Sequence, residues 1–447
     1  MPAYSDDACD GTHDPHLRSW VEDANGHADF PIQNLPLGVF RPRGAEPQAG
    51  IAIGDHILSI PSLLDAGLLA GDALTAGRAA AQGPTLNPLL ELGAPCRQAL
   101  RAAASRILAE GSPRRPGLLH RAADCELLLP AHIGDYTDFY AGIHHALNVG
   151  RLFRPDHPLL PNYKWVPIGY HGRSSSLRPS GTPVRRPLGQ RKLPDESSPA
   201  FGPSRNLDFE LELGVWIGPG NPLGQPVPIE AAERSIAGYC LLNDWSARDL
   251  QSWEYQPLGP FLAKNFHTTV SPWIITPEAL APFRQPQLPR SADDPKPLPY
   301  LLSDSDQRRG ALNLSLEVFL LTHAMRQAGL EPQRITASHA ENLYWTPAQL
   351  VTHHASNGCN LCPGDLLGTG TISSADPTGF GSLLEITRSG REPLRLASGE
   401  ERRFLEDGDE VMLRARACRE GFVSIGFGAC RAVVTPACTE GGNACHA

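Results

Sequence analysis

The stretch LDFELELGVWIG, from Leu207 to Gly218, alternates between apolar and other residues. Every odd position from 207 to 217 is apolar, whereas the even positions begin with Asp208, Glu210 and Glu212. This period of two predicts a β-strand with one apolar face and one acidic face. Carboxylates two residues apart on a strand lie roughly 7 Å from each other, so in a dry site each one raises the pKa of the next.

Two environments would neutralise such an acidic face. Water does so when the strand is half solvated, as in many antiparallel sheets. A hard divalent cation does so when the face is buried, because carboxylates are the ligands that it prefers and a strand holds them rigidly. The alternation alone leaves both interpretations open.

Size and composition narrow the class of protein. The chain has 447 residues, enough for two or three domains with a substantial core. Its 41% apolar and 19% charged residues argue against disorder, and its 43 Gly and 43 Pro favour short strands joined by turns. The net charge of -9 argues against a nucleic-acid partner. With no membrane-spanning run and no signal peptide in the sequence, we expect a soluble cytoplasmic protein with reduced cysteines.

The pattern along the chain predicts two domains of mainly β structure. Residues 1–25 are expected to be a disordered extension, and residues 435–447 a tail. Short strands and then a helix over residues 87–111, in which Asn87 is the N-cap, predict an N-terminal domain at 26–128. Strand-like segments dominate residues 129–434, which we interpret as the larger domain.

Four stretches concentrate functional groups: IGDYTDFYAGIHHALNVGRLFR, the carboxylate strand, LLNDWSARDLQSWEYQPLGPFLAKNFHTT and GTGTISSADPTGFGSLLEIT. Most of their side chains have ordinary structural explanations, such as strand ends and surface ion pairs. Glu385 is harder to explain, because it lies in the apolar run LLEI, interpreted as a strand, and a buried carboxylate without a partner costs several kcal/mol. A histidine would be a suitable partner, giving a base oriented by a carboxylate.

The chain resembles the fumarylacetoacetase family in DYTDFY, HALNVGRLFR, VPIGYHGRSSS, PSGTPVRRPLGQ, LDFELELGVWIGPGN, NDWSARDLQSWEYQPLGPFLAKNF, THHASNGCNLCPGDLLGTGTIS and FLEDGDEV. The similarity runs in order from about residue 30 to about residue 430. It implies a small SH3-like N-terminal β domain with a helical linker. It also implies a C-terminal β-sandwich roll that forms a homodimer and contains the active site.

The resemblance also implies a cation site for Ca²⁺ or Mg²⁺. The implied ligands are Asp138, Glu210, Glu212 and Asp244. Asp208 lies outside this set and is expected to face water. A 1,3-dicarbonyl substrate offers two oxygens for the remaining coordination positions. A second ion is implied on Asp244, Lys264 and Thr268.

The activity that the resemblance implies is hydrolysis of the carbon–carbon bond of 4-fumarylacetoacetate to fumarate and acetoacetate, the last step of tyrosine and phenylalanine degradation. His145 would be the general base, oriented by Glu385. The oxyanion would be stabilised by Arg248, Gln251 and Lys264. The implied substrate-binding residues are Tyr140, Arg154, Tyr170, Gln251, Tyr255 and Thr371.

Two positions depart from the family pattern. His267 replaces a glycine next to the implied second ion, and His144 adjoins His145 as a competing base. One alternative function is that of an acylpyruvate hydrolase or another metal-dependent member of the same superfamily. A second alternative is a non-catalytic metal- or ligand-binding protein, which would have no need of a His145–Glu385 pair. A third, a structural partner using the Pro-rich loops for recognition, has little support.

Overall fold

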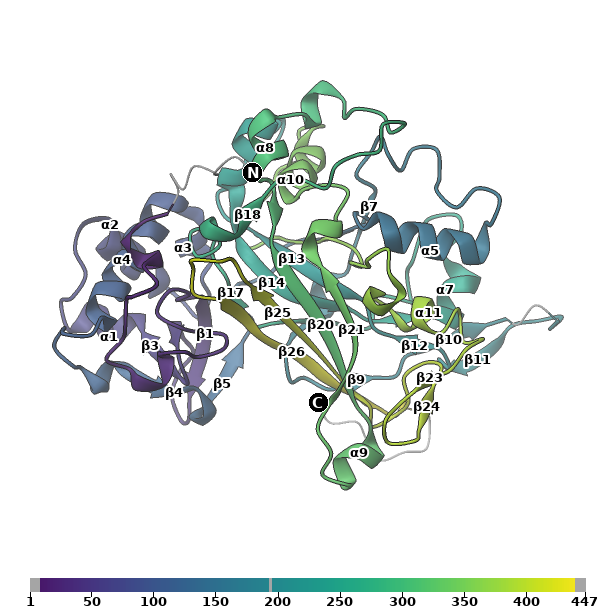
Figure 1. Ribbon diagram of the computed structural model, residues 1–447, viewed down its shortest axis with the longest axis horizontal. Coiled ribbons are helices and arrows are strands. Elements are labelled where there is room, and N and C mark those ends of the chain that lie inside the picture. The colour runs from purple at the N-terminus through teal and green to yellow at the C-terminus, as the bar shows by residue number, and fades with distance from the viewer. Residues whose placement is uncertain (1–8, 193–194, 439–447) are drawn as a thin grey trace.

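The computed structural model describes residues 9–192 and 195–438. These residues form an N-terminal domain and a larger C-terminal domain, which lie side by side and share part of one hydrophobic core (Figure 1). The mainly β fold class predicted from the sequence is confirmed. No helix among the described residues has the length and apolar composition that crossing a membrane requires.

The described part of the N-terminal domain contains a six-stranded sheet and four α-helices. Its strands are β1 (Leu37–Pro42), β2 (Gln48–Ile53), β3 (His56–Ser59), β4 (Leu119–Arg121), β5 (Cys125–Leu128) and β17 (Trp273–Ile274). Its helices are α1 (Ile60–Asp65), α2 (Gly71–Ala80), α3 (Asn87–Glu91) and α4 (Ala94–Leu108). Strand β17 comes from the C-terminal part of the chain and pairs with β1. One sheet therefore crosses the domain boundary.

The single helix predicted over residues 87–111 is two helices, α3 and α4. Gly93 separates them with a φ of +75°, a conformation that glycine adopts without strain. Pro95 then stands in the first turn of α4, where its missing N–H costs no hydrogen bond. Helix α3 begins at Asn87 itself, so Leu86 and not Asn87 is the N-cap. The helical character was predicted correctly, and the break was not.

The N-terminal extension also differs from the prediction. Residues 1–8 lie outside the described residues, but the segment that follows folds onto the N-terminal domain. It contains two short 3₁₀ helices, Gly11–His13 and Glu22–Ala24. Between them, the buried Trp20 donates from its indole Nε1 to the Ile107 carbonyl at 2.8 Å.

Two large sheets form the centre of the described part of the C-terminal domain. The seven-stranded sheet has the order β7 (Gly169–His171), β6 (Tyr136–Phe139), β22 (Leu366–Gly368), β13 (Leu211–Ile217), β14 (Ile236–Asp244), β16 (Thr268–Val270) and β8 (Leu177–Pro179). The five-stranded sheet has the order β21 (Gln333–His339), β20 (Leu314–Leu321), β25 (Glu410–Ala417), β26 (Ile425–Thr435) and β9 (Val184–Arg185). The long strands of the second sheet cross in front of β13 and β14 in Figure 1.

Short pairs and helices surround these sheets. The strand pairs are β10 (Leu188–Arg191) with β11 (Ala200–Pro203), β12 (Leu207–Asp208) with β15 (Ser246–Ala247), β18 (Arg284–Gln285) with β19 (Ala311–Leu312), and β23 (Leu394–Arg395) with β24 (Glu401–Arg402). The helices are α5 (Ile143–Phe153), α6 (Ile229–Ala232), α7 (Arg248–Glu254), α8 (Asp304–Arg309), α9 (His323–Gln327), α10 (Pro347–Ala355) and α11 (Leu383–Ile386). Helices α5, α7 and α11 lie on the side away from the N-terminal domain (Figure 1).

The stretch 207–218 runs through β12 and β13 with both of its faces buried. Leu213 and Val215, on the odd face, belong to the core between the two large sheets. On the even face, Trp216 packs into the core shared with the N-terminal domain. The expectation that Asp208 faces water is wrong, because its exposed fraction is 0%. A solvated acidic face is thereby excluded, and the carboxylates need partners inside the protein.

Candidate active site

Three carboxylates meet at one end of the seven-stranded sheet, on the face that carries the even-numbered residues of β13. Asp138 is the last residue but one of β6, Glu212 lies in β13 and Asp244 ends β14. Their ligand oxygens lie within 4.8 Å of one another, and all three side chains are buried. The pairing of β6 with β22, of β22 with β13 and of β13 with β14 brings together residues that are far apart in the sequence.

The oxygens of this cluster lack enough protein donors. Asp138 Oδ1 and Glu212 Oε1 are buried and have no hydrogen-bond partner among the described residues. Burial, followed by repulsion from Asp244, raises the pKa of Asp138 well above its usual value. Burial and the charges of Asp138 and Asp244 raise the pKa of Glu212 in the same way. Unpaired carboxylate oxygens at this spacing fit a hard divalent cation, which stabilises their charged forms.

Glu210, the fourth predicted ligand, lies beside the cluster in a different environment. Lys264 Nζ donates to its Oε2, and Arg248 Nη2 lies 2.8 Å from its Oε1. Burial opposes ionisation, but the attraction of Lys264 and Arg248 outweighs it and lowers the pKa of Glu210 to about 2. Glu210 is thus an anion whose charge two cationic side chains already balance.

Lys264 bridges Glu210 and Asp244. Besides Glu210, its Nζ donates to Asp244 Oδ2 at 2.7 Å and to the Asp244 carbonyl at 3.3 Å. Although burial opposes the charge, Asp244 and Glu210 raise the pKa of Lys264. A protonated amine has no lone pair to offer a metal, so this side chain balances negative charge and does not ligate an ion. Thr268 Oγ1 also donates to Asp244, at 2.8 Å.

The predicted contact between His145 and Glu385 is present. His145 Nδ1, on α5, lies 2.7 Å from Glu385 Oε2, and both side chains are buried. Glu385 lies on α11 and not on the strand that its apolar neighbours suggest, because Ser382 caps a short helix there. The engaged Nδ1 leaves Nε2 as the nitrogen that can take a proton.

Three further donors fix the Glu385 carboxylate. Asn148 Nδ2 donates to its Oε1 at 2.9 Å. Ser373 and Ser382 donate to its Oε2 at 2.9 and 2.8 Å. Burial alone would raise the pKa of Glu385, but His145 and these donors outweigh it and lower the pKa. Glu385 is therefore an anion able to orient the imidazole and to stabilise its protonated form.

Arg248 and Gln251 form the other side of the site, on α7. Arg248 Nη1 donates to Gln251 Oε1 at 3.1 Å, which leaves the amide nitrogen of Gln251 as a donor for another group. Arg248 Nε donates to Asp208 Oδ2 at 2.9 Å. Instead of reaching solvent, Asp208 therefore anchors an arginine at the edge of the site.

The predicted substrate-binding residues are only partly assembled around this centre. Tyr140 meets the His145 ring edge-on, with centroids 5.7 Å apart. Tyr170 donates to Asp244 Oδ2 at 3.2 Å. Arg154 is the C-cap residue that follows α5, and its Nε is buried without a partner in the described part of the chain. Thr371 is buried, whereas Tyr255, at the end of α7, is 40% exposed.

Sequence reasoning missed several residues that shape the site. Gly368 is one, because a Cβ there would lie 2.6 Å from Asp138 Oδ1 and 3.0 Å from Glu212 Oε2. Gly370 is another, since its N–H donates to Glu212 Oε2 at 3.0 Å. Both belong to GTGTISSADPTGFGSLLEIT, one of the four stretches that concentrate functional groups. Asn148, Ser373 and Ser382, the donors to Glu385, had no pattern that would reveal them.

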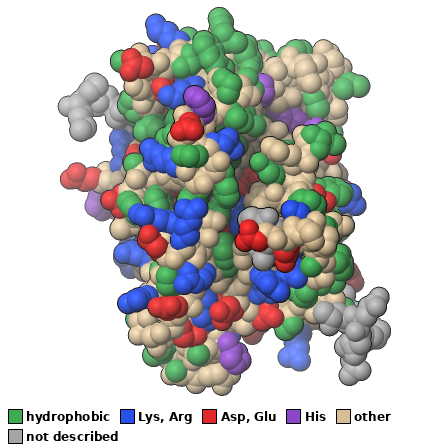
Figure 2. All heavy atoms as spheres, turned by 90° about the vertical axis from the view of Figure 1, so that its right-hand side faces the viewer, with side chains coloured by type: hydrophobic (Ala, Val, Ile, Leu, Met, Phe, Trp, Pro, Cys, Tyr) green, Lys and Arg blue, Asp and Glu red, His purple; other side chains and the backbone are tan. Residues whose placement is uncertain are grey.

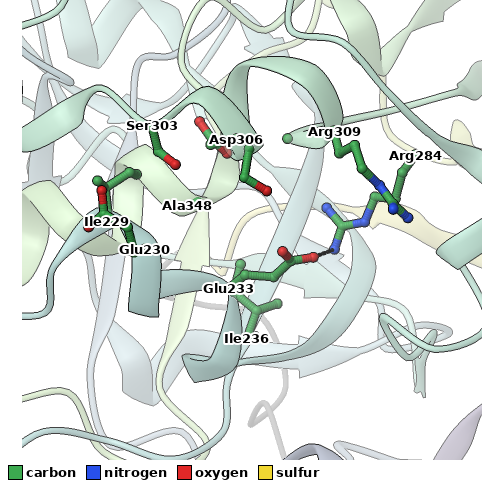
Figure 3. Close-up of a pocket in the computed structure, with 11 residues that line it drawn as sticks. Ile229, Glu230, Glu233, Ile236, Arg284, Ser303, Asp306, Arg309 and Ala348 are labelled. Atoms are coloured by element: carbon green, nitrogen blue, oxygen red, sulfur yellow. Dashed lines mark ion pairs between the residues drawn. The ribbon is translucent and has the colours of Figure 1, made fainter. Parts of the chain in front are cut away.

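A separate pocket lies between α6 and α8, lined by Glu233, Arg284 and Asp306 among others (Figure 3). Its volume of about 50 Å³ holds one or two water molecules. Burial raises the pKa of Asp306 to about 6, and Arg284 pairs with Glu233 at 2.8 Å. None of the predicted site residues lines this pocket, so it is distinct from the carboxylate cluster.

Comparisons with known proteins agree with this architecture. A family model described as fumarylacetoacetase N-terminal matches residues 33–130, and one described as fumarylacetoacetate (FAA) hydrolase C-terminal matches residues 136–435. The fold and the site thus define a hydrolase of the fumarylacetoacetate hydrolase class.

Curated relatives narrow the class further. Fumarylacetoacetase of Bos taurus is 45% identical over 419 residues, covering 92% of this chain and 97% of the relative. That of Oryza sativa subsp. japonica is 45% identical over 440 residues, covering 96% and 99%. That of Homo sapiens is 45% identical over 419 residues, with 92% and 97% covered. The chain belongs to the fumarylacetoacetase family.

Proposed function

We propose that this chain hydrolyses the carbon–carbon bond of 4-fumarylacetoacetate, giving fumarate and acetoacetate. The observation that carries the proposal is the contact of His145 with Glu385 beside a buried carboxylate cluster, in a chain of this family. A non-catalytic binder would need the cluster but not the oriented histidine. The pair therefore favours catalysis over binding alone.

Each residue of the site has a separate role in the proposed reaction. His145 Nε2 accepts a proton from water, and Glu385 stabilises the imidazolium that forms. The hydroxide adds to the ketone carbonyl next to the bond that breaks, and Arg248 and Gln251 donate to the resulting oxyanion. When the bond breaks, its electron pair leaves on the acetoacetate fragment as an enolate, and His145 returns the proton to carbon. One water is consumed, and its oxygen appears in the fumarate carboxylate.

Ca²⁺ or Mg²⁺ is the proposed cofactor, held by Asp138, Glu212 and Asp244, with Glu210 adjacent. When bound, such a cation stabilises negative charge on the two oxygens of a 1,3-dicarbonyl. Lys264 acts in our proposal by balancing Glu210 and Asp244, so that it supports the site electrostatically. A second ion near Asp244 and Thr268 remains a proposal, with Lys264 as a charge partner.

The dicarboxylate substrate suits the residues around the centre. We assign a terminal carboxylate of the substrate to Arg154, whose Nε has no partner among the described residues. Tyr140, Tyr170, Tyr255 and Thr371 complete the proposed binding set. The face toward α5, α7 and α11 is furrowed, and Lys and Arg side chains gather along one side of the furrow (Figure 2). Such a field favours the approach of an anion.

We further propose a cytoplasmic homodimer. Apolar side chains are exposed at the end of α7 and just after it, including Trp253 at 43%, Leu258 at 95% and Phe261 at 61%. An apolar surface next to a site is often covered by a partner. Sedimentation of the purified protein tests this, and a monomer at micromolar concentration would contradict it.

The first test of function is loss of the enol absorbance of fumarylacetoacetate on adding purified protein. We expect turnover that a chelator abolishes and that Mg²⁺ or Ca²⁺ restores, with fumarate and acetoacetate formed in equal amounts. An acylpyruvate is the matched comparison substrate. Preference for the acylpyruvate by orders of magnitude would move the assignment to another member of the superfamily, and no turnover of either would leave a binder.

A further inference from the structure

Asp208 has an unusual set of partners for a residue outside the ligand cluster. Its side chain is completely buried, and its two oxygens accept four hydrogen bonds. Oδ1 accepts from the backbone N–H groups of Leu383 at 2.7 Å and Phe209 at 2.9 Å. Oδ2 accepts from the N–H of Leu384 at 2.9 Å and from Arg248 Nε at 2.9 Å. All four partners are donors, so the position requires a group that only accepts.

Two of these donors control the placement of Glu385. Leu383 and Leu384 form the first turn of α11, whose N–H groups have no partner inside the helix. Asp208 binds both of them and so fixes the start of the helix. Glu385 is the next residue along that turn, and it holds His145 Nδ1 at 2.7 Å. The direction of the imidazole therefore depends on where α11 begins.

The fourth donor controls the opposite side of the site. Arg248 uses Nε for Asp208, Nη1 for Gln251 and Nη2 for Glu210. Asp208 thus fixes the plane of a guanidinium whose other two nitrogens contact Gln251 and Glu210. A single carboxylate connects the histidine side and the arginine side, which come from different elements of the fold.

The backbone of this region is held independently of the Asp208 side chain. Strand β12 pairs with β15, with Leu207 opposite Ala247 and Asp208 opposite Ser246. The N–H of Arg248 also donates to the Asn206 carbonyl at 2.9 Å. Changing the side chain therefore alters the direction of the guanidinium and of α11 while these backbone contacts remain.

We propose that Asp208 is a positioning residue that sets the Glu385–His145 pair and the Arg248–Gln251 pair in a fixed relation to each other. This inference rests on the proposed function, because it requires the two pairs to act from opposite sides of one reacting carbonyl group. Asp208 touches neither substrate nor cation and acts through its partners. An error of about 1 Å between a base and an oxyanion donor lowers a rate by roughly a hundredfold.

The test replaces the acceptor with an isosteric amide, Asp208→Asn. The amide NH₂ would point a donor at backbone N–H groups or at the guanidinium, so one side must move. We expect kcat to fall about 100-fold, with KM within about 3-fold of the parent value. The matched control is Asp409→Asn, since Asp409 is also a fully buried carboxylate, bound to Arg402 at 2.9 and 3.0 Å and to the N–H of Glu406 at 2.9 Å. That variant should lose stability but keep kcat.

Double-mutant cycles separate positioning from a general loss of fold. Asp208→Asn is combined with Glu385→Gln in one cycle and with Arg248→Lys in another. If Asp208 acts through both pairs, the fold-loss of kcat in each double variant should be much smaller than the product of the two single fold-losses. Full additivity in either cycle, a kcat within about 3-fold of the parent, or an equal kcat loss in the Asp409 control would each overturn the proposal.

A measurement without turnover keeps this inference separate from the proposed reaction. The proton on His145 Nδ1, shared with Glu385, should give a far-downfield ¹H resonance that disappears in Glu385→Gln. We expect Asp208→Asn to shift or broaden this signal and Asp409→Asn to leave it in place. An unmoved signal overturns the positioning role even if the parent is active. A moved signal in a parent that fails to turn over fumarylacetoacetate supports the positioning role and contradicts the reaction.

Discussion

Glu210 and Glu212 show, at the scale of single residues, how environment gives two identical side chains different tasks. They lie two residues apart in the sequence, Glu210 between β12 and β13 and Glu212 within β13. Despite burial, Lys264 and Arg248 lower the pKa of Glu210 to about 2. Burial and two neighbouring carboxylates raise the pKa of Glu212. Glu210 can therefore anchor the cationic side chains, whereas an added positive charge would favour the ionised form of Glu212.

The base assignment can be tested with two adjacent histidines. We expect His145→Ala to lower kcat roughly a thousandfold, because general base catalysis contributes about 10² to 10⁴ in rate. Cation affinity, measured by titration calorimetry, should stay near the parent value, since His145 is not a ligand. His144→Ala is the control and should keep most activity, because it is His145 that contacts Glu385. The reverse ranking of the two variants would make His144 the base.

Gly368 gives a test of the carboxylate cluster that removes no charged group. In Gly368→Ala, the new Cβ would lie 2.6 Å from Asp138 Oδ1 and 3.0 Å from Glu212 Oε2. We expect cation affinity to fall about 10- to 100-fold, as it does when groups that orient ligands are disturbed. Gly117→Ala is the control, because a Cβ there meets no atom within 4 Å and its φ is not positive. Equal affinities in the two variants would show that the cluster does not bind the cation.

Individual elements show what the sequence could and could not predict. The alternation over 207–218 predicted one strand, and the structure has two, β12 and β13, with residues 209 and 210 between them. The resemblance named the carboxylates of the cluster and the His145–Glu385 contact that the structure brings together. The same alternation could not reveal that both strand faces are buried. The residues that cover these faces belong to a second sheet and to the N-terminal domain, which are distant in sequence. The run LLEI was interpreted as a strand because short apolar segments fit both periods, whereas the Ser382 cap and the acceptor oxygens of Asp208 start a short helix there.

The three strands that carry the cluster make cation binding depend on pH. Without a cation, the folded-state pKa values of Asp138 and Glu212 are raised above the unfolded values near 4. The folded protein then holds extra protons, and the stability that they contribute is present below about pH 4 and lost as pH rises through the raised values. A cation must displace these protons, so it binds more tightly at higher pH.

Thermal unfolding with and without Ca²⁺ or Mg²⁺ measures this linkage. We expect the increase in Tm on adding a cation to be larger at pH 8 than at pH 5. Glu212→Gln should weaken the effect at both pH values and make it less dependent on pH. An increase that is the same at both pH values in the parent protein would mean that these carboxylates are already ionised without the cation.

The molecule as a whole is held together by contacts between its two domains. Strand β17 extends the N-terminal sheet, and residues of both domains share one core cluster. The first described segment adds to this, since His13 Nε2 lies 2.8 Å from the Glu278 carbonyl. The prediction of disorder is wrong for this segment. Its contacts are to residues distant in sequence, and such contacts cannot be inferred from composition.

Arg97 of α4 and Glu278 of the C-terminal domain form the buried ion pair of this junction. Arg97 Nη2 lies 3.1 Å from Glu278 Oε1, and the two side chains are 2% and 10% exposed. Arg97→Ala would leave Glu278 buried without its partner, so we expect unfolding free energy to fall by about 3 kcal/mol. Arg41→Ala is the control, because its pair with Glu126 is largely exposed and contributes less than about 1 kcal/mol. Denaturant unfolding should therefore show a clear shift of the midpoint for Arg97→Ala and a small one for Arg41→Ala. Equal shifts would mean that the sheet and the shared core, and not this pair, hold the domains together.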